Sequence, residues 1–313
     1  MEQHRPVLCS CALDGVRLNY VVAMPLDVKL AEFLGKRGSE NSITYYNRKA
    51  GNDVVVFLAP TAIDEKFYAV AEALTVADQV VMSTATVDRL FGELLVACSL
   101  LGKHVIFTRD NGIDALLSSA KVADFEFSEK EELLLKIAAK RPGATEQATR
   151  VDIDKAFNVR GIGLVVLGIV TKGTVRVHDE LYHGAEKVTV RSIQSQDEDV
   201  QEAAPGTRVG LALKGADTDE IDKGDILTKE SSQKVSRISA SLEMSAIGKE
   251  QIAAGNSYAL VSNFSVSRAT VESVSAGACS FRLEKVLALQ AGDEFLLLRE
   301  QAPRIFAKGR VVL

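Results

Sequence analysis

Two kinds of apolar pattern follow one another along this chain, and the change falls at Arg141-Pro142-Gly143. Before that point, short apolar runs alternate with stretches whose apolar residues recur every three or four positions. Strand side chains repeat every two residues and helix side chains every 3.6, so the runs predict strands and the stretches predict helices. The expected strands span 18–24, 53–58, 79–83 and 103–108, and the expected helices span 27–36, 63–74, 87–101, 112–119 and 129–140.

This alternation is typical of right-handed strand–helix–strand units on a largely parallel sheet. Residues 1–143 are therefore expected to form an open α/β domain of Rossmann-like type. In such domains the ligand edge lies at the carboxyl ends of the strands.

The pattern after the α/β segment is different. Residues 141–150 (RPGATEQATR) have linker composition. From Val151 onward, β-branched segments are spaced by Gly, Asp and Lys without helical periodicity, which predicts all-β structure. A charged loop at 227–237 divides this part, so two small β-barrels are expected, over 151–229 and 233–313.

Composition narrows the class of protein. With 47% hydrophobic and 25% charged residues, the 313-residue chain fits a multidomain globular protein. The formal net charge of -5 argues against a non-specific coat on nucleic acid, and DNA is not expected as a partner. The sequence shows neither a secretory signal nor an apolar run of membrane-spanning length, which predicts a cytoplasmic protein with no membrane partner.

The cysteines do not suggest a metal site. Cys9, Cys11, Cys98 and Cys279 lack the spacing of metal ligands. Core packing as reduced thiols is the favoured interpretation, and a redox or metal pair at Cys9 and Cys11 is the alternative. No catalytic triad or metal cluster is predicted.

Residues 151–229 carry the most specific pattern. The stretch RVDIDKAFNVRGIGLVVLGIVTKGTVRVHDELY is followed by EAAPGTRVGLALKGADTDEIDKGDILTK, with glycines at barrel corners. This pattern resembles domain II of translational GTPases of the elongation factor Tu type. CSFRLEKVLALQAGDEFLLLR at 279–299 resembles domain III of the selenocysteine-specific branch. The fourth domain of that branch is expected to be missing.

The resemblance implies that residues 1–143 are related to a GTPase domain with a phosphate loop, G-x-x-x-x-G-K-(S/T), after the first long strand. That place holds Ala23-Met24-Pro25-Leu26-Asp27-Val28-Lys29-Leu30. Ala23 and Val28 replace the glycines, Leu30 replaces the hydroxyl residue, and Lys29 alone matches. Val is strained at glycine torsions and Leu cannot bind magnesium, so a degenerate loop is expected.

Two further motifs of the family are altered. The D-x-P-G-H motif aligns with Leu58-Ala59-Pro60-Thr61-Ala62, which lacks the metal-holding acid and the water-positioning His. The guanine-reading motif aligns with Thr108-Arg109-Asp110-Asn111, where Asn111 stands in place of the acid unless Asp110 substitutes by a register slip. Thr44 is interpreted as a remnant of the first switch threonine. Plain surface charge is the favoured interpretation of Lys29 and Arg109.

Together these losses predict a pseudo-GTPase, with no catalytic residue and no GTP or magnesium cofactor. The main hypothesis is a protein that binds tRNA, the ribosome or a translation factor without GTP hydrolysis. Two alternatives stay open: a GTP-binding elongation factor with a divergent nucleotide site, and a protein-binding scaffold without RNA contact. The sequence leaves the oligomeric state open.

The resemblance also implies an aminoacyl-tRNA pocket in domain II, closed by an acidic residue. By position, Glu202 is that acid, and Val165 and Leu213 are the apolar walls. Ile162 and Leu164 replace an Arg and a Thr of the family. A solvated turn residue is the alternative for Glu202, and an apolar edge here would instead suit a protein partner.

The third segment has more basic than acidic residues, which allows a modest RNA-facing surface. Its candidate RNA contacts are Arg299, Arg304, Lys308 and Arg310. Basic residues on an outer strand usually only keep the strand soluble, and this interpretation stands beside the first.

Overall fold

The computed structural model describes residues 19–50, 53–61, 67–108, 112–140, 148–216, 220–247, 251–275 and 278–312. The chain divides into two compact units. The N-terminal unit spans Met1–Gly143 and also takes in Met244–Gly248 and Gln301–Phe306. The C-terminal unit holds the rest of the chain, including both β-barrels.

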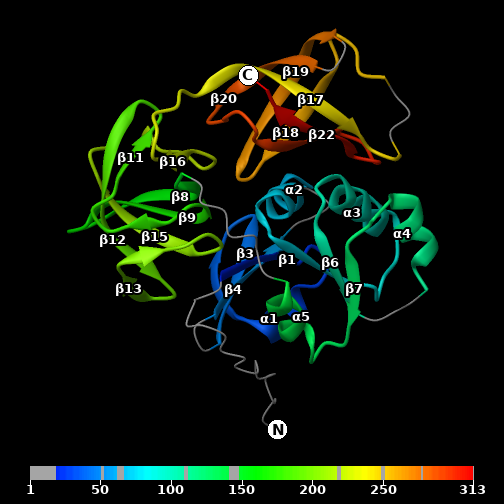
Figure 1. Ribbon diagram of the computed structural model, residues 1–313, viewed down its shortest axis with the longest axis horizontal. Coiled ribbons are helices and arrows are strands. Elements are labelled where there is room, and N and C mark those ends of the chain that lie inside the picture. The colour runs from blue at the N-terminus through cyan, green and yellow to red at the C-terminus, as the bar shows by residue number, and fades with distance from the viewer. Residues whose placement is uncertain are drawn as a thin grey trace. The chain divides into compact units, whose positions relative to one another are not determined.

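In the described part of the N-terminal unit, one sheet has seven strands in the order β2-β3-β4-β1-β5-β6-β7 (Figure 1). Their bounds are β1 Asn19–Ala23, β2 Lys36–Glu40, β3 Ile43–Ala50, β4 Asp53–Pro60, β5 Gln79–Ser83, β6 His104–Thr108 and β7 Phe125–Ser128. Strands β4, β1, β5, β6 and β7 are parallel, while β3 pairs antiparallel with β4 and β2 antiparallel with β3. The expected open, largely parallel sheet is confirmed.

The helices cover both faces of this sheet. Their bounds are α1 Val28–Leu34, α2 Phe67–Val76, α3 Arg89–Leu100, α4 Asp114–Ala120 and α5 Leu133–Ala139. Helices α1 and α5 share a core cluster with Tyr20 and Phe57 of the sheet, and α2 and α3 lie on the opposite face (Figure 1). None of these described helices is long and apolar enough to cross a membrane.

Three strands of the sheet are absent from the sequence prediction. Every residue of β2 is exposed, so its sequence KRGSE carries no apolar alternation. β3 has polar residues at consecutive positions and β7 has only four residues, so neither produces a clear pattern. The helix expected over 27–36 ends at Leu34 because Gly35 is extended and Lys36 begins β2.

The first barrel of the C-terminal unit, called barrel II, follows the linker. Its strands are β8 Arg150–Val159, β9 Gly163–Lys172, β10 Val175–Arg176, β11 Glu180–His183, β12 Glu186–Ser195, β13 Glu198–Val200, β14 Glu202–Ala203, β15 Arg208–Lys214 and β16 Ile226–Thr228. The sheet order is β11-β16-β8-β9-β15-β12-β13, and β11 also pairs with β12, which closes the sheet on itself. Alternate residues of the strands, such as Val151, Ile153 and Val166, fill the interior.

The second barrel, called barrel III, is closed in the order β17-β20-β19-β18-β21-β22. Its strands are β17 Val235–Met244, β18 Ser257–Ser262, β19 Ser265–Ser275, β20 Ala278–Leu287, β21 Glu294–Leu298 and β22 Ile305–Val311. Phe281 and Phe295 meet edge to face in its core with ring centroids 6.3 Å apart. Both predicted barrels are thus present.

A buried ion network joins the two barrels within the C-terminal unit. Arg150 of β8 donates through Nη1 to both carboxylate oxygens of Asp293, each at 2.7 Å, and through Nη2 to Asp152 at 3.0 Å. The amide of Asn263, in the turn between β18 and β19, donates to Asp152 at 2.8 Å. Burial by itself raises the pKa of Asp152, but the Arg150 guanidinium outweighs that effect and the pKa is lowered.

A second polar contact between the barrels surrounds Asp225. His183 Nε2 lies 2.8 Å from the Asp225 carboxylate, and Lys234 Nζ donates to the same carboxylate at 2.8 Å. The Ser265 hydroxyl of barrel III donates to the Gly224 carbonyl at 2.6 Å. Gly224 has a φ of +91°, and a Cβ there would lie 2.9 Å from the Phe264 carbonyl oxygen, so only glycine lets the barrels approach this closely.

We expect Arg150→Met to destabilise the C-terminal unit strongly. The substitution leaves two buried carboxylates without their guanidinium, and breaking such a buried pair costs about 3–5 kcal/mol. The free energy of unfolding in urea, followed by circular dichroism, measures the loss.

Arg176→Gln is the matched control, because its 3.0 Å pair with Glu202 has both side chains 60% exposed. Such a surface pair contributes roughly 0–1 kcal/mol. If both variants lose equally little stability, the network does not hold the barrels together.

Candidate functional site

The carboxyl edge of β1, where the resemblance places a phosphate loop, has a short connection to α1. After β1 ends at Ala23, Met24 still donates its backbone N–H to the Leu58 carbonyl of β4 at 2.8 Å. Helix α1 begins at Val28. Only three residues therefore lie between the last sheet contact and the helix.

Asp27 is the N-cap residue of α1. Its carboxylate accepts the backbone N–H of Leu30 at 2.8 Å, and its carbonyl accepts the N–H of Ala31 at 3.2 Å. A helix N-terminus attracts phosphate because its first N–H groups point outward and carry partial positive charge. Here a carboxylate already uses one of these donors and adds a negative charge that repels phosphate.

The other residues of this segment face in two directions. Leu30 is 5% exposed and belongs to the core cluster of Tyr20 and Met24, while Val28 and Lys29 are exposed. A buried leucine cannot present an oxygen to magnesium. The residues described at this edge therefore do not fit GTP with its magnesium ion.

The second and third motif positions lie along the same edge. Leu58 and Pro60 belong to β4, and Thr44 is buried on β3, where it pairs with Ala59. The Thr61 hydroxyl donates to the Ser42 carbonyl at 3.2 Å. These residues serve the pairing of β3 with β4.

Thr108 ends β6, and its carbonyl accepts the Thr84 hydroxyl at 2.9 Å. The remaining predicted nucleotide-site residues, Ala62, Arg109, Asp110 and Asn111, lie outside the described residues, as do Cys9 and Cys11.

The five predicted pocket residues of barrel II divide between the barrel core and its surface. Leu164 and Leu213 point into the barrel core, 4% and 3% exposed, so Leu164 does not contribute to an apolar edge at this place. Ile162 lies on the exposed turn between β8 and β9. Glu202 lies on β14, where it pairs with Arg176 of β10. It forms an exposed ion pair with Arg176 at 3.0 Å.

Val165 points away from the core and lies in a different apolar surface. Its cross-strand partners are Phe157 on β8 and Ala212 on β15, and Leu167 contacts the backbone at Gly210. We call these five residues the β9 outer face. The sequence signal for it is the alternation along β9, where Leu164 and Val166 are buried and Val165 and Leu167 are half-buried.

Two of the four candidate RNA-binding residues pair with acidic side chains. Lys308 pairs with Glu243 at 3.0 Å, and Arg310 pairs with Glu294 at 2.9 Å. Arg299 is half-buried after β21.

Arg304 belongs to the N-terminal unit. Its backbone N–H donates to Glu93 at 3.0 Å, and its guanidinium lies 4.6 Å from the centre of the Phe67 ring. The basic residues are therefore used in local contacts of the two units.

The described cysteines are structural. Cys98 and Cys279 are buried free thiols, and burial raises the pKa of Cys98 to about 12, so it is not a thiolate nucleophile. Among the described residues there is no group of three or more His, Cys, Asp or Glu side chains that could hold a metal ion.

Comparison with known proteins agrees with the barrel pattern. The family model for elongation factor Tu domain 2 matches residues 163–228. An uncharacterized protein of Methanocaldococcus jannaschii is 30% identical over 292 residues, which cover 89% of this chain and 94% of that protein. The selenocysteine-specific elongation factor of the same organism is 29% identical over 191 residues, covering 52% of this chain and 41% of the factor.

The chain belongs to the translational GTPase family. A crystal structure of the translation elongation factor SelB from Methanococcus maripaludis, in complex with the GTP analogue GPPNHP, superposes with a TM-score of 0.79. The match covers 95% of this chain and 79% of that chain at 22% identity, which establishes a shared fold. The expected kinship with elongation factor Tu and the selenocysteine-specific factor is confirmed.

We expect Asp27→Ala to lower the stability of this family member's N-terminal unit by about 1 kcal/mol, because an N-cap carboxylate is lost. Asp27→Asn is the control, since asparagine caps helices as well as aspartate does. Urea unfolding followed by circular dichroism measures both. Equal losses in the two variants would contradict the capping role.

Proposed function

We propose that this chain is a translation factor-like binding protein that engages the acceptor end of tRNA and does not use GTP as a switch. The observation that supports it is the start of α1, where the Asp27 carboxylate accepts the Leu30 N–H and the Leu30 side chain lies in the core. A pseudo-GTPase of this kind keeps the domains of its relatives while its nucleotide edge serves as structure.

The β9 outer face supplies the proposed tRNA surface. The Phe157 ring is half-buried beside Val165, and Lys155 Nζ lies 5.7 Å from its centre. Single-stranded nucleotides bind by stacking a base on an aromatic ring and pairing a phosphate with a cation. The unpaired end of tRNA has this chemistry, and SelB, which shares the fold, is a translation elongation factor by name.

A protein partner without RNA is the second candidate. Ile162 is 45% exposed on the turn that joins β8 and β9. An apolar residue at such a position also suits docking to another protein. Salt dependence separates the two, because RNA binding weakens steeply with salt as counterions are released, whereas docking through an apolar residue does not.

The test of the proposal is the affinity for tRNA measured in three nucleotide states. Fluorescently labelled aminoacyl-tRNA is titrated with the full chain in the presence of GTP and magnesium, GDP and magnesium, or EDTA without nucleotide. The dissociation constants are expected to agree within about twofold, because no nucleotide changes the conformation. A tenfold tightening with GTP would contradict the proposal, and absence of binding would favour the protein partner.

Phe157→Ala tests the surface itself in the same assay. Loss of one base–aromatic stack costs about 1–3 kcal/mol, so binding should weaken about fivefold or more. Tyr68→Ala is the matched control, because Tyr68 is an aromatic residue of α2 that is 43% exposed. If the two variants bind tRNA with equal affinity, the β9 outer face is not the tRNA-binding surface.

A further inference from the structure

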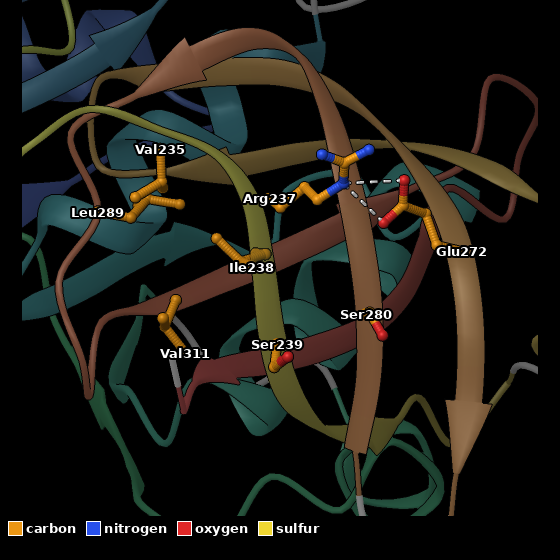
Figure 2. A pocket seen from close by; sticks show the side chains of 8 residues that line it. All are labelled: Val235, Arg237, Ile238, Ser239, Glu272, Ser280, Leu289 and Val311. Atoms are coloured by element: carbon orange, nitrogen blue, oxygen red, sulfur yellow. Dashed lines mark hydrogen bonds and ion pairs between the residues drawn. The ribbon is translucent and has the colours of Figure 1, made fainter.

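Barrel III contains a small pocket that the proposed tRNA surface does not use. Its volume is about 260 Å³. It is smaller than the roughly 300–1,000 Å³ of sites for drug-sized ligands, so it suits a group about as large as one residue. The lining side chains come from β17, β19, β20, β22 and the loop before β21, and they are Val235, Arg237, Ile238, Ser239, Glu272, Ser280, Leu289 and Val311 (Figure 2).

One half of the pocket is apolar. Ile238, Leu289 and Val311 are 5%, 4% and 3% exposed, and Val235 is half-buried next to Leu289 (Figure 2). These side chains belong to closed barrel strands and one adjoining loop, so they form a fixed floor. A branched aliphatic group placed there would lose water contact and gain dispersion contacts.

The other half carries an oriented guanidinium. Arg237 donates through Nε to both oxygens of Glu272, at 3.2 and 3.1 Å. Figure 2 shows its two terminal amino groups pointing away from Glu272. The Arg237 side chain is 69% exposed, so these amino groups can be reached by a ligand. Because Glu272 already fixes Nε, little side-chain freedom remains to be lost on binding.

The charged side chains at the pocket favour a ligand that carries a single negative charge. Arg282 Nε lies 3.7 Å from Glu272, so two guanidinium groups share one carboxylate. The excess of one positive charge suits a carboxylate, which guanidinium binds through two parallel hydrogen bonds. A phosphate dianion fits less well because it has no aliphatic body and lies closer to the Glu272 charge.

We propose that this pocket binds a carboxylate attached to a branched aliphatic group, with the carboxylate on the Arg237 amino groups and the aliphatic group on Ile238, Leu289 and Val311. This chemistry occurs at the C-terminal residue of a polypeptide and in a free branched-chain carboxylic acid. The site is independent of tRNA binding, since its residues lie on barrel III and the β9 outer face lies on barrel II.

The test is a titration of the full chain, labelled at isoleucine, leucine and valine methyl groups, followed by NMR. N-acetyl-leucine represents a polypeptide C-terminus and 4-methylpentanoate represents the free acid. Saturable shifts are expected at Ile238, Leu289 and Val311. N-acetyl-leucinamide, which lacks the charge, should bind at least tenfold more weakly, and acetate, which lacks the aliphatic group, should do the same.

The two acids distinguish the sources. Binding of N-acetyl-leucine alone assigns the pocket to a polypeptide C-terminus, and equal or tighter binding of 4-methylpentanoate assigns it to a free acid. If the amide binds as well as the acid, or if no ligand shifts these methyl groups, the proposal is wrong.

Arg237→Gln should weaken binding tenfold or more while leaving the other methyl signals in place. Arg237→Lys keeps the charge but loses the paired donors, and an intermediate affinity is expected. Arg310→Gln is the matched control on the same barrel, because Arg310 is 62% exposed and pairs with Glu294 at 2.9 Å. Unchanged affinity in Arg237→Gln would overturn the assignment.

Discussion

The connection between β1 and α1 is the constraint on which the N-terminal unit depends. The pairing of β1 with β4 continues through Met24, so only Pro25, Leu26 and Asp27 remain to turn the chain into the helix. Ala23–Leu30 has the length of a phosphate loop, but a pairing that runs on through Met24 and a helix start capped by Asp27 leave few backbone N–H groups to wrap phosphates. The chain therefore satisfies its own helix start, and Leu30 and Met24 pack inward to complete the core on that face. The family has a phosphate-binding loop at this place, and this chain has a turn capped by Asp27. This difference is the physical basis of the proposal that the chain does not use GTP as a switch.

The C-terminal unit is organised by a different interaction. Arg150 lies between Asp152 of its own strand and Asp293 of the next barrel, and all three are buried. Removing a charge from water costs desolvation free energy. Buried charges are therefore tolerated only when each has a partner with good geometry. The close approach at Gly224 supplies a second, non-ionic contact between the barrels. These two contacts hold the barrels together. The β9 outer face and the Arg237 pocket therefore lie on barrels that are joined by protein contacts alone.

Much of the fold could be predicted from the sequence because its pattern is strong. The alternation of runs and spaced apolar residues located each helix, and the glycine-rich, β-branched texture after Val151 predicted both barrels. β2 could not be predicted in this way because it is a fully exposed edge strand, and β3 because its buried residues stand at consecutive positions from Ile43 to Tyr46.

The candidate site was less predictable, because register decides which side of a strand a residue faces. Leu164 and Val165 are neighbours in the sequence, yet one lies in the core and the other on the β9 outer face. A shift of one position in matching a motif reverses these roles, and Leu213 and Ala212 differ in the same way. The ion pairs of Lys308 and Arg310 depend on which acidic residues the strands bring alongside, which no local pattern encodes.

Calorimetric titration of the full chain with GTP, GDP and a non-hydrolysable GTP analogue, each with magnesium, tests the central claim most directly. The account predicts no heat of binding at millimolar nucleotide, since the donors and oxygens that phosphate and magnesium need are capped or replaced. Saturable binding at micromolar concentration, which corresponds to about -8 kcal/mol, would show that the edge still holds a nucleotide and would contradict the account.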